Sequence, residues 1–301
     1  MATVEDILLL LNITILGLLI VSSTIYLLPL LCLSRFHTIS NAFTGNVAFA
    51  IWFSASSWFI IMILTNYKTE IFNTSASCLI INFFQTFSTI HIPLALISVS
   101  LNRVCSIIYP AKAYFRSKHW AVVSIGSQWI LGFLLSLPHL FSTDYVRQKK
   151  TTHVKIENYI LAFLKVCITA YWVNIYTFLV MVIIPLTLNT ILNAIILRHV
   201  RQSTQRIQPT HPTISHASLQ RRDIRLLQHM IILFCLFIVG WCPIYISAFI
   251  DALQYNPLVN LLFMTLAELS IFFDILDLFL YNHDLRRFFL YEVFRVNQPI
   301  N

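Results

Sequence analysis

Three carboxylic acids, Glu268, Asp274 and Asp277, interrupt an otherwise apolar stretch near the end of the chain. Asp274 and Asp277 are three residues apart, so they would share one face of a helix. Ionisable side chains in an apolar helix are costly and usually have a function. Two chemistries fit: the Asp carboxylates hold a cation with help from Ser23 and Asn46, or one of them carries a proton. The sequence slightly favours the second.

No sequence pattern of a common catalytic site is present. The chain has no His-Glu-x-x-His, Gly-x-Ser-x-Gly or Cys-x-x-Cys run, the patterns that mark zinc, serine-hydrolase and dithiol chemistry. His91 and His139 stand alone in apolar surroundings, where a histidine is more often structural. We therefore expect a protein that is not an enzyme and that needs no cofactor or metal.

Seven apolar stretches carry these residues, and each is long enough to cross a lipid bilayer. Hydrophobic residues make up 58% of the chain and charged residues 11%, with a mean hydropathy of +0.77. A helix needs about 20 apolar residues to cross the hydrocarbon core, where the backbone finds no water. The sequence predicts an all-α membrane protein, one seven-helix domain over residues 1–301. The predicted spans are 7–33, 42–65, 77–108, 119–141, 171–199, 222–252 and 257–281, followed by a short interfacial helix over 283–296.

The positive charges are divided unequally between the two sides of this bundle. Most of the 20 Lys and Arg residues lie in the odd-to-even connections and in the tail. The side richer in Lys and Arg is normally cytoplasmic. We expect a multi-pass protein of the plasma membrane with an extracellular N-terminus and a cytoplasmic C-terminus. The net charge of +8 reflects this bias, and nucleic-acid binding is not expected.

Two of the six cysteines would face the extracellular side, Cys78 at the start of the third span and Cys167 before the fifth. Disulfides persist in such an oxidising compartment and not in the cytosol. We predict a Cys78–Cys167 bridge, the alternative being two unpaired buried thiols. Asn73 begins a glycosylation sequon, Asn-Thr-Ser, on the same side.

The third span carries the strongest mark of a known family. Cys78 opens it, Arg103 follows 25 residues later, and Pro110 comes just beyond. This spacing resembles the rhodopsin-like (class A) G-protein-coupled receptors, whose third helix ends in an acidic-Arg-aromatic triplet. Asn102 replaces the acid here and Val104 the aromatic residue. The resemblance covers almost the whole chain and implies a receptor that binds an extracellular ligand and activates a heterotrimeric G protein.

The sixth and seventh spans carry further marks of this family. Phe237, Trp241 and Pro243 are similar to its aromatic and Trp-x-Pro pattern. Tyr281 matches the last residue of its Asn-Pro-x-x-Tyr pattern, in which Asp277 replaces the Asn. Other matching positions are Asn46, Trp129, Pro138, Pro185 and Phe288. Other departures are Ile51 for an Asp, Asn193 for a Tyr and Leu278 for a Pro.

The resemblance implies a two-state switch at the inner ends of the third and sixth spans. Pro243 cannot donate a backbone hydrogen bond, so the sixth span should kink there, beside Trp241. In the family an acid of the sixth helix pairs with the Arg of the third, and Asp223 stands at that position. We expect an Arg103–Asp223 contact whose loss lets the sixth span swing outward. The alternative is a solvated Asp223 at the start of a helix.

The ligand would bind in the outer half of the bundle. The candidate ligand-binding residues are Asn82, Gln85, Trp172, Asn174, Asp251 and Tyr255. Gln85 stands where amine receptors of the family have an Asp, which disfavours a biogenic amine, and Ile271 replaces the retinal-binding Lys of opsins. The basic outer loop weakly favours a ligand with acidic groups, although charges that only keep the loop solvated explain it better. A peptide or a small molecule remains open.

A secondary transporter or a proton- or ion-coupled membrane protein is the alternative function. The acids of the seventh span motivate it, because transport pathways use intramembrane carboxylates. Transporters usually show duplicated halves, whereas this chain has an odd number of spans and no internal repeat. The sequence therefore favours the receptor.

Overall fold

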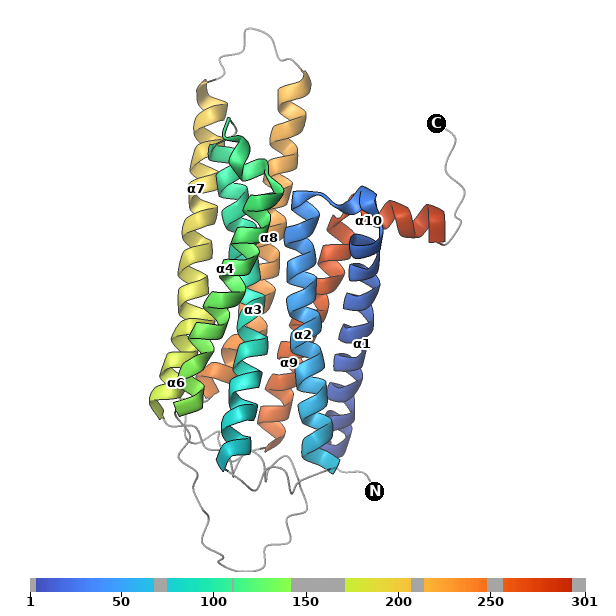
Figure 1. The fold of residues 1–301 in the computed structure, drawn as a ribbon, viewed down its shortest axis with the longest axis vertical. Coiled ribbons are helices and arrows are strands. Elements are labelled where there is room, and N and C mark those ends of the chain that lie inside the picture. Colours follow the sequence, from blue (N-terminus) through green and yellow to red (C-terminus); the bar gives the residue numbers. More distant parts are fainter. Residues whose placement is uncertain are drawn as a thin grey trace, which may run out of the picture.

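The computed structural model of the chain describes residues 4–67, 75–109, 111–141, 171–206, 214–247 and 257–293. Within these ranges the chain forms a bundle of long helices that run side by side (Figure 1). The helices are α1 (Val4–Cys32), α2 (Ile39–Tyr67), α3 (Ser75–Ile108), α4 (Lys118–Ser136), α6 (Tyr171–Phe178), α7 (Ile184–Arg206), α8 (Ile214–Ser247), α9 (Pro257–Tyr281) and α10 (His283–Arg287). The predicted all-α fold of seven membrane helices with a short terminal helix is confirmed.

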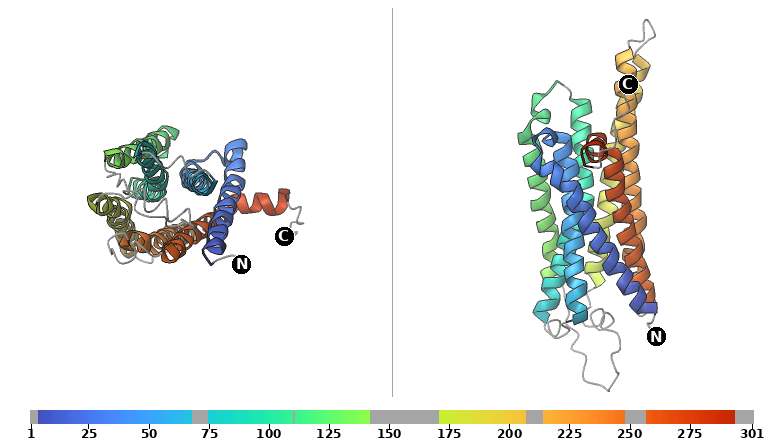
Figure 2. Two further views of the ribbon diagram at one scale, coloured as in Figure 1. Left: turned by 90° about the horizontal axis from the view of Figure 1, so that it is seen from below. Right: turned by 90° about the vertical axis from the view of Figure 1, so that its right-hand side faces the viewer.

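Short helical turns extend or connect several of these helices. The π-helical turn Leu179–Ile183 joins α6 to α7, so the two form one continuous helix. Another π-helical turn, Phe288–Val293, continues α10. The other turns are 3-10 helices at Ser34–Phe36, Ala113–Arg116 and Leu137–Phe141. The helix α10 and its π-turn leave the bundle at a steep angle (Figure 2).

The bundle is apolar on the outside and carries polar groups inside, as lipid requires. Leu10 and Leu31 of α1 are 65% and 70% exposed, whereas Asn12 and Ser23 of the same helix are fully buried. Six helical stretches among the described residues are long and apolar enough to cross a membrane. The apolar stretch of α8, Ile231–Ser247, is shorter.

Two helices extend further at their inner ends than hydropathy predicts. The fifth span continues to Arg206 instead of ending at 199, and the sixth begins at Ile214 instead of 222. Hydropathy marks only the part of a helix that lies in lipid, and a helix does not have to stop where the bilayer does. The sequence therefore located these helices but not their polar ends.

The π-turn between α6 and α7 follows from Pro185. In a regular α-helix, the N–H of residue 185 would pair with the carbonyl of Met181, but proline has no N–H. The N–H of Ile184 instead bonds the carbonyl of Leu179, five residues back. The widened turn buries three consecutive residues, Val180 to Val182.

Two glycines lie at close contacts between helices. A Cβ at Gly132 of α4 would clash with the imidazole of His91 on α3, lying 2.8 Å from its Nδ1. A Cβ at Gly240 of α8 would clash with the side chain of Ser270 on α9. Neither position tolerates a side chain without movement of a neighbour, so both glycines bring their helices together.

The chain turns sharply after α9 because Asn282 caps the next helix. Its side chain oxygen accepts the N–H of Leu285 (3.2 Å), and its Nδ2 lies 3.3 Å from both Tyr26 Oη and Asn41 Oδ1. Leu285 is fully buried below this cap. These contacts fix α10 at the end of the bundle opposite to the start of α1 (Figure 1).

Candidate functional site

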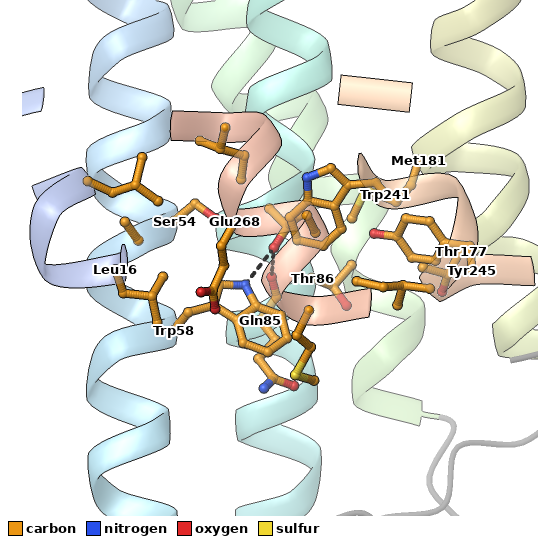
Figure 3. Close-up of a pocket in the computed structure, with 17 residues that line it drawn as sticks. Leu16, Ser54, Trp58, Gln85, Thr86, Thr177, Met181, Trp241, Tyr245 and Glu268 are labelled. Carbon is orange, nitrogen blue, oxygen red and sulfur yellow. Dashed lines mark hydrogen bonds between the residues drawn. The ribbon is translucent and has the colours of Figure 1, made fainter. Parts of the chain in front are cut away.

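A cavity of about 150 Å³ lies between the helices, in the half of the bundle where α1, α3 and α6 begin (Figure 3). Its lining side chains come from α1, α2, α3, α6, α8 and α9 and from the π-turn Leu179–Ile183. Its lining residues are Leu16, Leu19, Ser54, Ala55, Trp58, Gln85, Thr86, Thr89, Thr177, Met181, Trp241, Ile244, Tyr245, Met264, Ala267, Glu268 and Ile271. A space of this size accepts a ring-sized group.

Aromatic side chains form a large part of the wall. Trp58 Nε1 donates a hydrogen bond to Thr89 Oγ1 (3.1 Å), which fixes the indole of α2 against α3. The Trp58 ring lies 6.5 Å from that of Trp241, centroid to centroid. Trp241 is stacked between Phe237 and Tyr245 on α8, with centroids 6.0 Å apart in both pairs. The cavity therefore meets α8 at an indole that is held by its neighbours.

One carboxylate faces this cavity. Glu268 of α9 is only 7% exposed, and its buried Oε2 has no hydrogen-bond partner. Figure 3 shows Glu268, Trp58 and Trp241 around the same space. Among the residues described as lining it, none is a Lys, Arg or His. The charge of Glu268 therefore has no counter-ion in the wall.

His139 lies behind the wall and bridges two of its residues. Its Nδ1 is 3.3 Å from Thr86 Oγ1 on α3, and its Nε2 is 3.2 Å from Thr177 Oγ1 on α6. Tyr176 Oη also donates to the carbonyl of Leu135 (2.7 Å). These bonds hold the end of α6 against α3 and the end of α4.

The predicted ligand residues are distributed unevenly. Gln85 lines the cavity, whereas Asn82 and Asn174 are not among its lining residues, and Trp172 is 51% exposed. Asp251 and Tyr255 lie outside the described residues. Sequence reasoning missed Trp58, Thr86, Tyr245 and the position of Glu268. Helical spacing carried part of the signal, because Ser54 and Trp58 are four residues apart and so share a face.

The register of α1 against α9 places the other buried acid. Thr265 Oγ1 donates to Asn12 Oδ1 (2.9 Å), and the rings of Tyr26 and Phe279 are 5.0 Å apart. Both pairs have the same offset of 253 residues. Ser23 is therefore level with position 276, between Asp274 and Asp277.

Asp274 is almost completely enclosed at this level. It is 1% exposed, and neither of its carboxylate oxygens has a hydrogen-bond partner. Ser23 is fully buried, and its hydroxyl has no partner either. The structure thus places Ser23 at the level of these acids, and the cation and the proton both stay predictions.

Asn46, the fourth member of the predicted ion site, turns to α4 instead. Its Nδ2 donates to Gln128 Oε1 (2.6 Å), and its Oδ1 accepts from Trp129 Nε1 (3.0 Å). Gln128 Nε2 also donates to the backbone carbonyl of His91 (3.4 Å), whose ring stacks on Trp129 at 3.8 Å. These four residues form a buried polar cluster between α2, α3 and α4, which we call the α4 cluster.

The predicted switch lies where α3, α7 and α8 end or begin. Arg103 lies in α3, and Asp223 lies in α8, but the side chain of Asp223 is outside the part of the chain that the structure describes. Phe237 is fully buried, and α8 continues past Pro243 to Ser247. The Arg103–Asp223 contact and the kink stay predictions.

The neighbours of Arg103 are tied to other helices. Ser100 Oγ donates to Asn189 Oδ1 on α7 (2.6 Å), and Asn193 Nδ2 lies 3.5 Å from the same oxygen. Asn102 Oδ1 accepts from Trp120 Nε1 on α4 (3.1 Å). Asn193, which replaces the tyrosine of the family, therefore belongs to a polar contact between α3 and α7.

An ion pair holds the terminal helix to the first inner turn. Arg35 makes two hydrogen bonds to Glu292, at 2.5 and 2.9 Å, and its guanidinium lies over the rings of Phe36 and Phe288 at 4.9 and 4.7 Å. The mutual hydrogen bond raises the pKa of Arg35 and lowers the pKa of Glu292. Both side chains are about half exposed, so water screens the pair. Sequence reasoning did not single out Glu292.

The cysteines fall into two groups. Cys78 is disulfide-bonded, and Cys32, Cys105, Cys235 and Cys242 are free. The predicted partner, Cys167, and the predicted glycosylation site, Asn73, lie outside the described residues. A bonded Cys78 lies at the same end of the bundle as the cavity.

Comparison with known proteins adds two findings. The family described as 7 transmembrane receptor (rhodopsin family) matches residues 22–281. Among solved structures, the chain is similar to squid rhodopsin, with 14% sequence identity and a TM-score of 0.70 over 98% of this chain and 87% of that one. At this identity the likeness concerns the fold alone. No curated protein sequence matches the chain.

Proposed function

The chain belongs to the rhodopsin family of seven-transmembrane receptors, and on this premise we propose that it detects a small extracellular ligand in the cavity and signals through outward movement of α8. Membership makes it a multi-pass G-protein-coupled receptor and not an enzyme. The family has an extracellular ligand and a heterotrimeric G protein as partners. The transporter alternative is set aside, because this is a receptor family.

We propose that the end of the bundle with the cavity faces the outside of the plasma membrane. Two observations support this orientation. The Lys and Arg residues concentrate toward the other end, and Cys78 at the cavity end is disulfide-bonded, which requires an oxidising compartment. The N-terminus is then extracellular and the C-terminus cytoplasmic, with Cys167 as the disulfide partner and Asn73 as a glycosylation site.

The contact of Trp241 with the cavity carries the proposed mechanism. A ligand that enters the cavity touches an indole of α8, and α8 also contains Asp223 at its inner end. Displacing this indole changes the packing of α8 around Pro243 and weakens the proposed Arg103–Asp223 contact. A ligand that prefers the open state by ~100-fold shifts the equilibrium by about 2.7 kcal/mol.

Basal signalling of an Asp223→Asn receptor tests this mechanism. The full chain is expressed with reporters for several heterotrimeric G proteins, and signals are compared at equal surface expression. Losing an ion pair worth ~1 kcal/mol should raise ligand-free signalling about fivefold.

Asp284→Asn is the matched control, because it removes an exposed acid of α10 at the same end of the bundle. It should signal like the unchanged receptor. If Asp223→Asn also leaves basal signalling unchanged, the proposed contact is wrong. If no reporter responds to any variant or ligand, the proposed coupling to a heterotrimeric G protein is wrong.

A further inference from the structure

The cavity wall contains one acid and no base among its described residues. Glu268 is 93% buried, counted from its 7% exposure, and its Oε2 has no partner. An unpaired carboxylate in a dry interior is costly, because its charge loses water without gaining an opposite charge. The lining residues from α1, α2, α3, α6 and α8 are all neutral. Among the described residues the wall offers Glu268 no opposite charge, so a positively charged occupant of the cavity would supply it.

The aromatic part of the wall favours the same kind of occupant. Trp58, Trp241 and Tyr245 line the cavity together with Glu268. The faces of aromatic rings attract cations, and tryptophan attracts them most strongly. The ring of Trp58 is fixed by its bond to Thr89 (3.1 Å). A carboxylate beside several aromatic rings is a site for an ammonium group.

We infer that the ligand of this receptor carries an ammonium group, which Glu268 binds through its carboxylate beside Trp58 and Trp241. The inference rests on the proposed function only in taking this cavity as the ligand site. The volume of about 150 Å³ limits the enclosed part of the ligand to one ring with a short chain. The side chains of Gln85 and Thr86 in the wall offer neutral oxygens for the remaining N–H groups.

This inference revises the ligand expected from the sequence. Gln85 disfavours recognition of an amine from the third helix, but Glu268 supplies the missing negative charge from α9. The basic outer loop weakly favours an acidic ligand, yet the part of the cavity wall that the structure describes offers an anion no opposite charge. Charge at the enclosed site decides binding, because loop charges in water are screened.

Three probes of similar size and different charge test this inference on the purified full chain. The probes are benzylammonium (positive), benzyl alcohol (neutral) and benzoate (negative). Binding is measured by isothermal titration and by the rise in thermal stability that a ligand of the folded state produces. We expect benzylammonium to bind at least about 10-fold more tightly than benzyl alcohol, and benzoate to bind most weakly. The inference is overturned if benzylammonium does not bind, if it binds no more tightly than benzyl alcohol, or if benzoate binds more tightly than either.

A pair of variants assigns the preference to one carboxylate. Glu268→Gln keeps the shape of the side chain and should reduce benzylammonium affinity about 30-fold while leaving benzyl alcohol binding within about twofold. Asp274→Asn removes the same charge six residues further along α9, from a residue that does not line the cavity, and should keep the preference. An equal loss in both variants means that the general field of α9 attracts the cation, which overturns the site.

The binding data and the signalling data fail separately. Benzylammonium binding to the purified chain needs no G protein, so it holds or fails whatever the reporters show. A receptor with a raised basal signal in Asp223→Asn but no preference for benzylammonium would keep its proposed function and lose this inference. The opposite pattern would keep the cation site and remove the proposed coupling.

Discussion

The α4 cluster and two acids of α9, Glu268 and Asp274, are buried polar groups in one bundle, but the two amides and the indole of the α4 cluster have hydrogen-bond partners within the protein. Asn46, Gln128 and Trp129 satisfy one another through bonds of 2.6 and 3.0 Å. Glu268 and Asp274 have buried carboxylate oxygens without hydrogen-bond partners. Buried polar groups are normally paired, so each exception calls for an explanation. Paired groups hold helices together, whereas an unpaired acid indicates a place where a proton, an ion or a ligand binds.

The largest effect is expected from Gly132→Ala on α4, which tests how tightly the α4 cluster is packed. Its new Cβ would lie 2.8 Å from His91 Nδ1, and the ring cannot retreat because it is stacked on Trp129 at 3.8 Å. We expect a loss of about 2–3 kcal/mol in unfolding free energy, measured by thermal unfolding of the full chain in detergent. Gly126→Ala is the control on the same helix, since a Cβ there meets nothing within 4 Å. Equal stability of the two variants would show that the α4 cluster is loosely packed.

The next test removes one polar group from each region. Gln128→Leu leaves the amide of Asn46 without its acceptor and should cost about 1–3 kcal/mol of unfolding free energy. Asp274→Asn removes a carboxylate that has no hydrogen-bond partner and should leave the receptor equally or more stable. The thermal unfolding midpoints of the two variants, measured in the same detergent, show whether only Gln128→Leu is destabilised. A strong loss in Asp274→Asn would mean that this acid already binds something that stabilises the fold.

The smallest effect concerns the exposed pair of Arg35 and Glu292. The pKa of Glu292 is lowered by its hydrogen bond to Arg35, so the pair stabilises the docked terminal helix above the ordinary pKa of a carboxyl group. This stabilisation is lost as the pH falls through the lowered pKa of Glu292, while Arg35 stays charged. Hydrogen exchange over residues 283–293 should be faster in Arg35→Gln than in the unchanged chain at neutral pH. The difference should vanish once the pH falls below the lowered pKa of Glu292, and a difference that persists in acid would assign the docking to the contacts of Arg35 with the rings of Phe36 and Phe288 instead.

The sequence predicted the membrane helices because each is a long apolar run, which depends on composition and not on neighbours. It identified Glu268 as a costly acid, but helical periodicity gives the faces of a helix and not which helices those faces meet. The contacts of Glu268 with a cavity, and of Asn46 with α4, depend on the rotation of each helix in the bundle. The pairing of Arg35 with Glu292 joins the first inner turn to the end of the chain, and neither residue type marks such a partner in advance.

The bare backbone at Gly240 has a consequence for how α8 can tilt. The backbone of α8 approaches Ser270 of α9 closely at this glycine, so a tilt of α8 about this contact would move its two ends in opposite directions. Tyr245 at the cavity is five residues from Gly240, and Asp223 is seventeen residues from it. At 1.5 Å per residue these separations are about 8 Å and 26 Å along the helix. If α8 tilts as a rigid helix about Gly240, a displacement of about 1 Å at Tyr245 would become about 3 Å at Asp223. In the proposed outward movement of α8, the close contact at Gly240 would turn a small shift at the cavity into a larger one at the inner end of the helix.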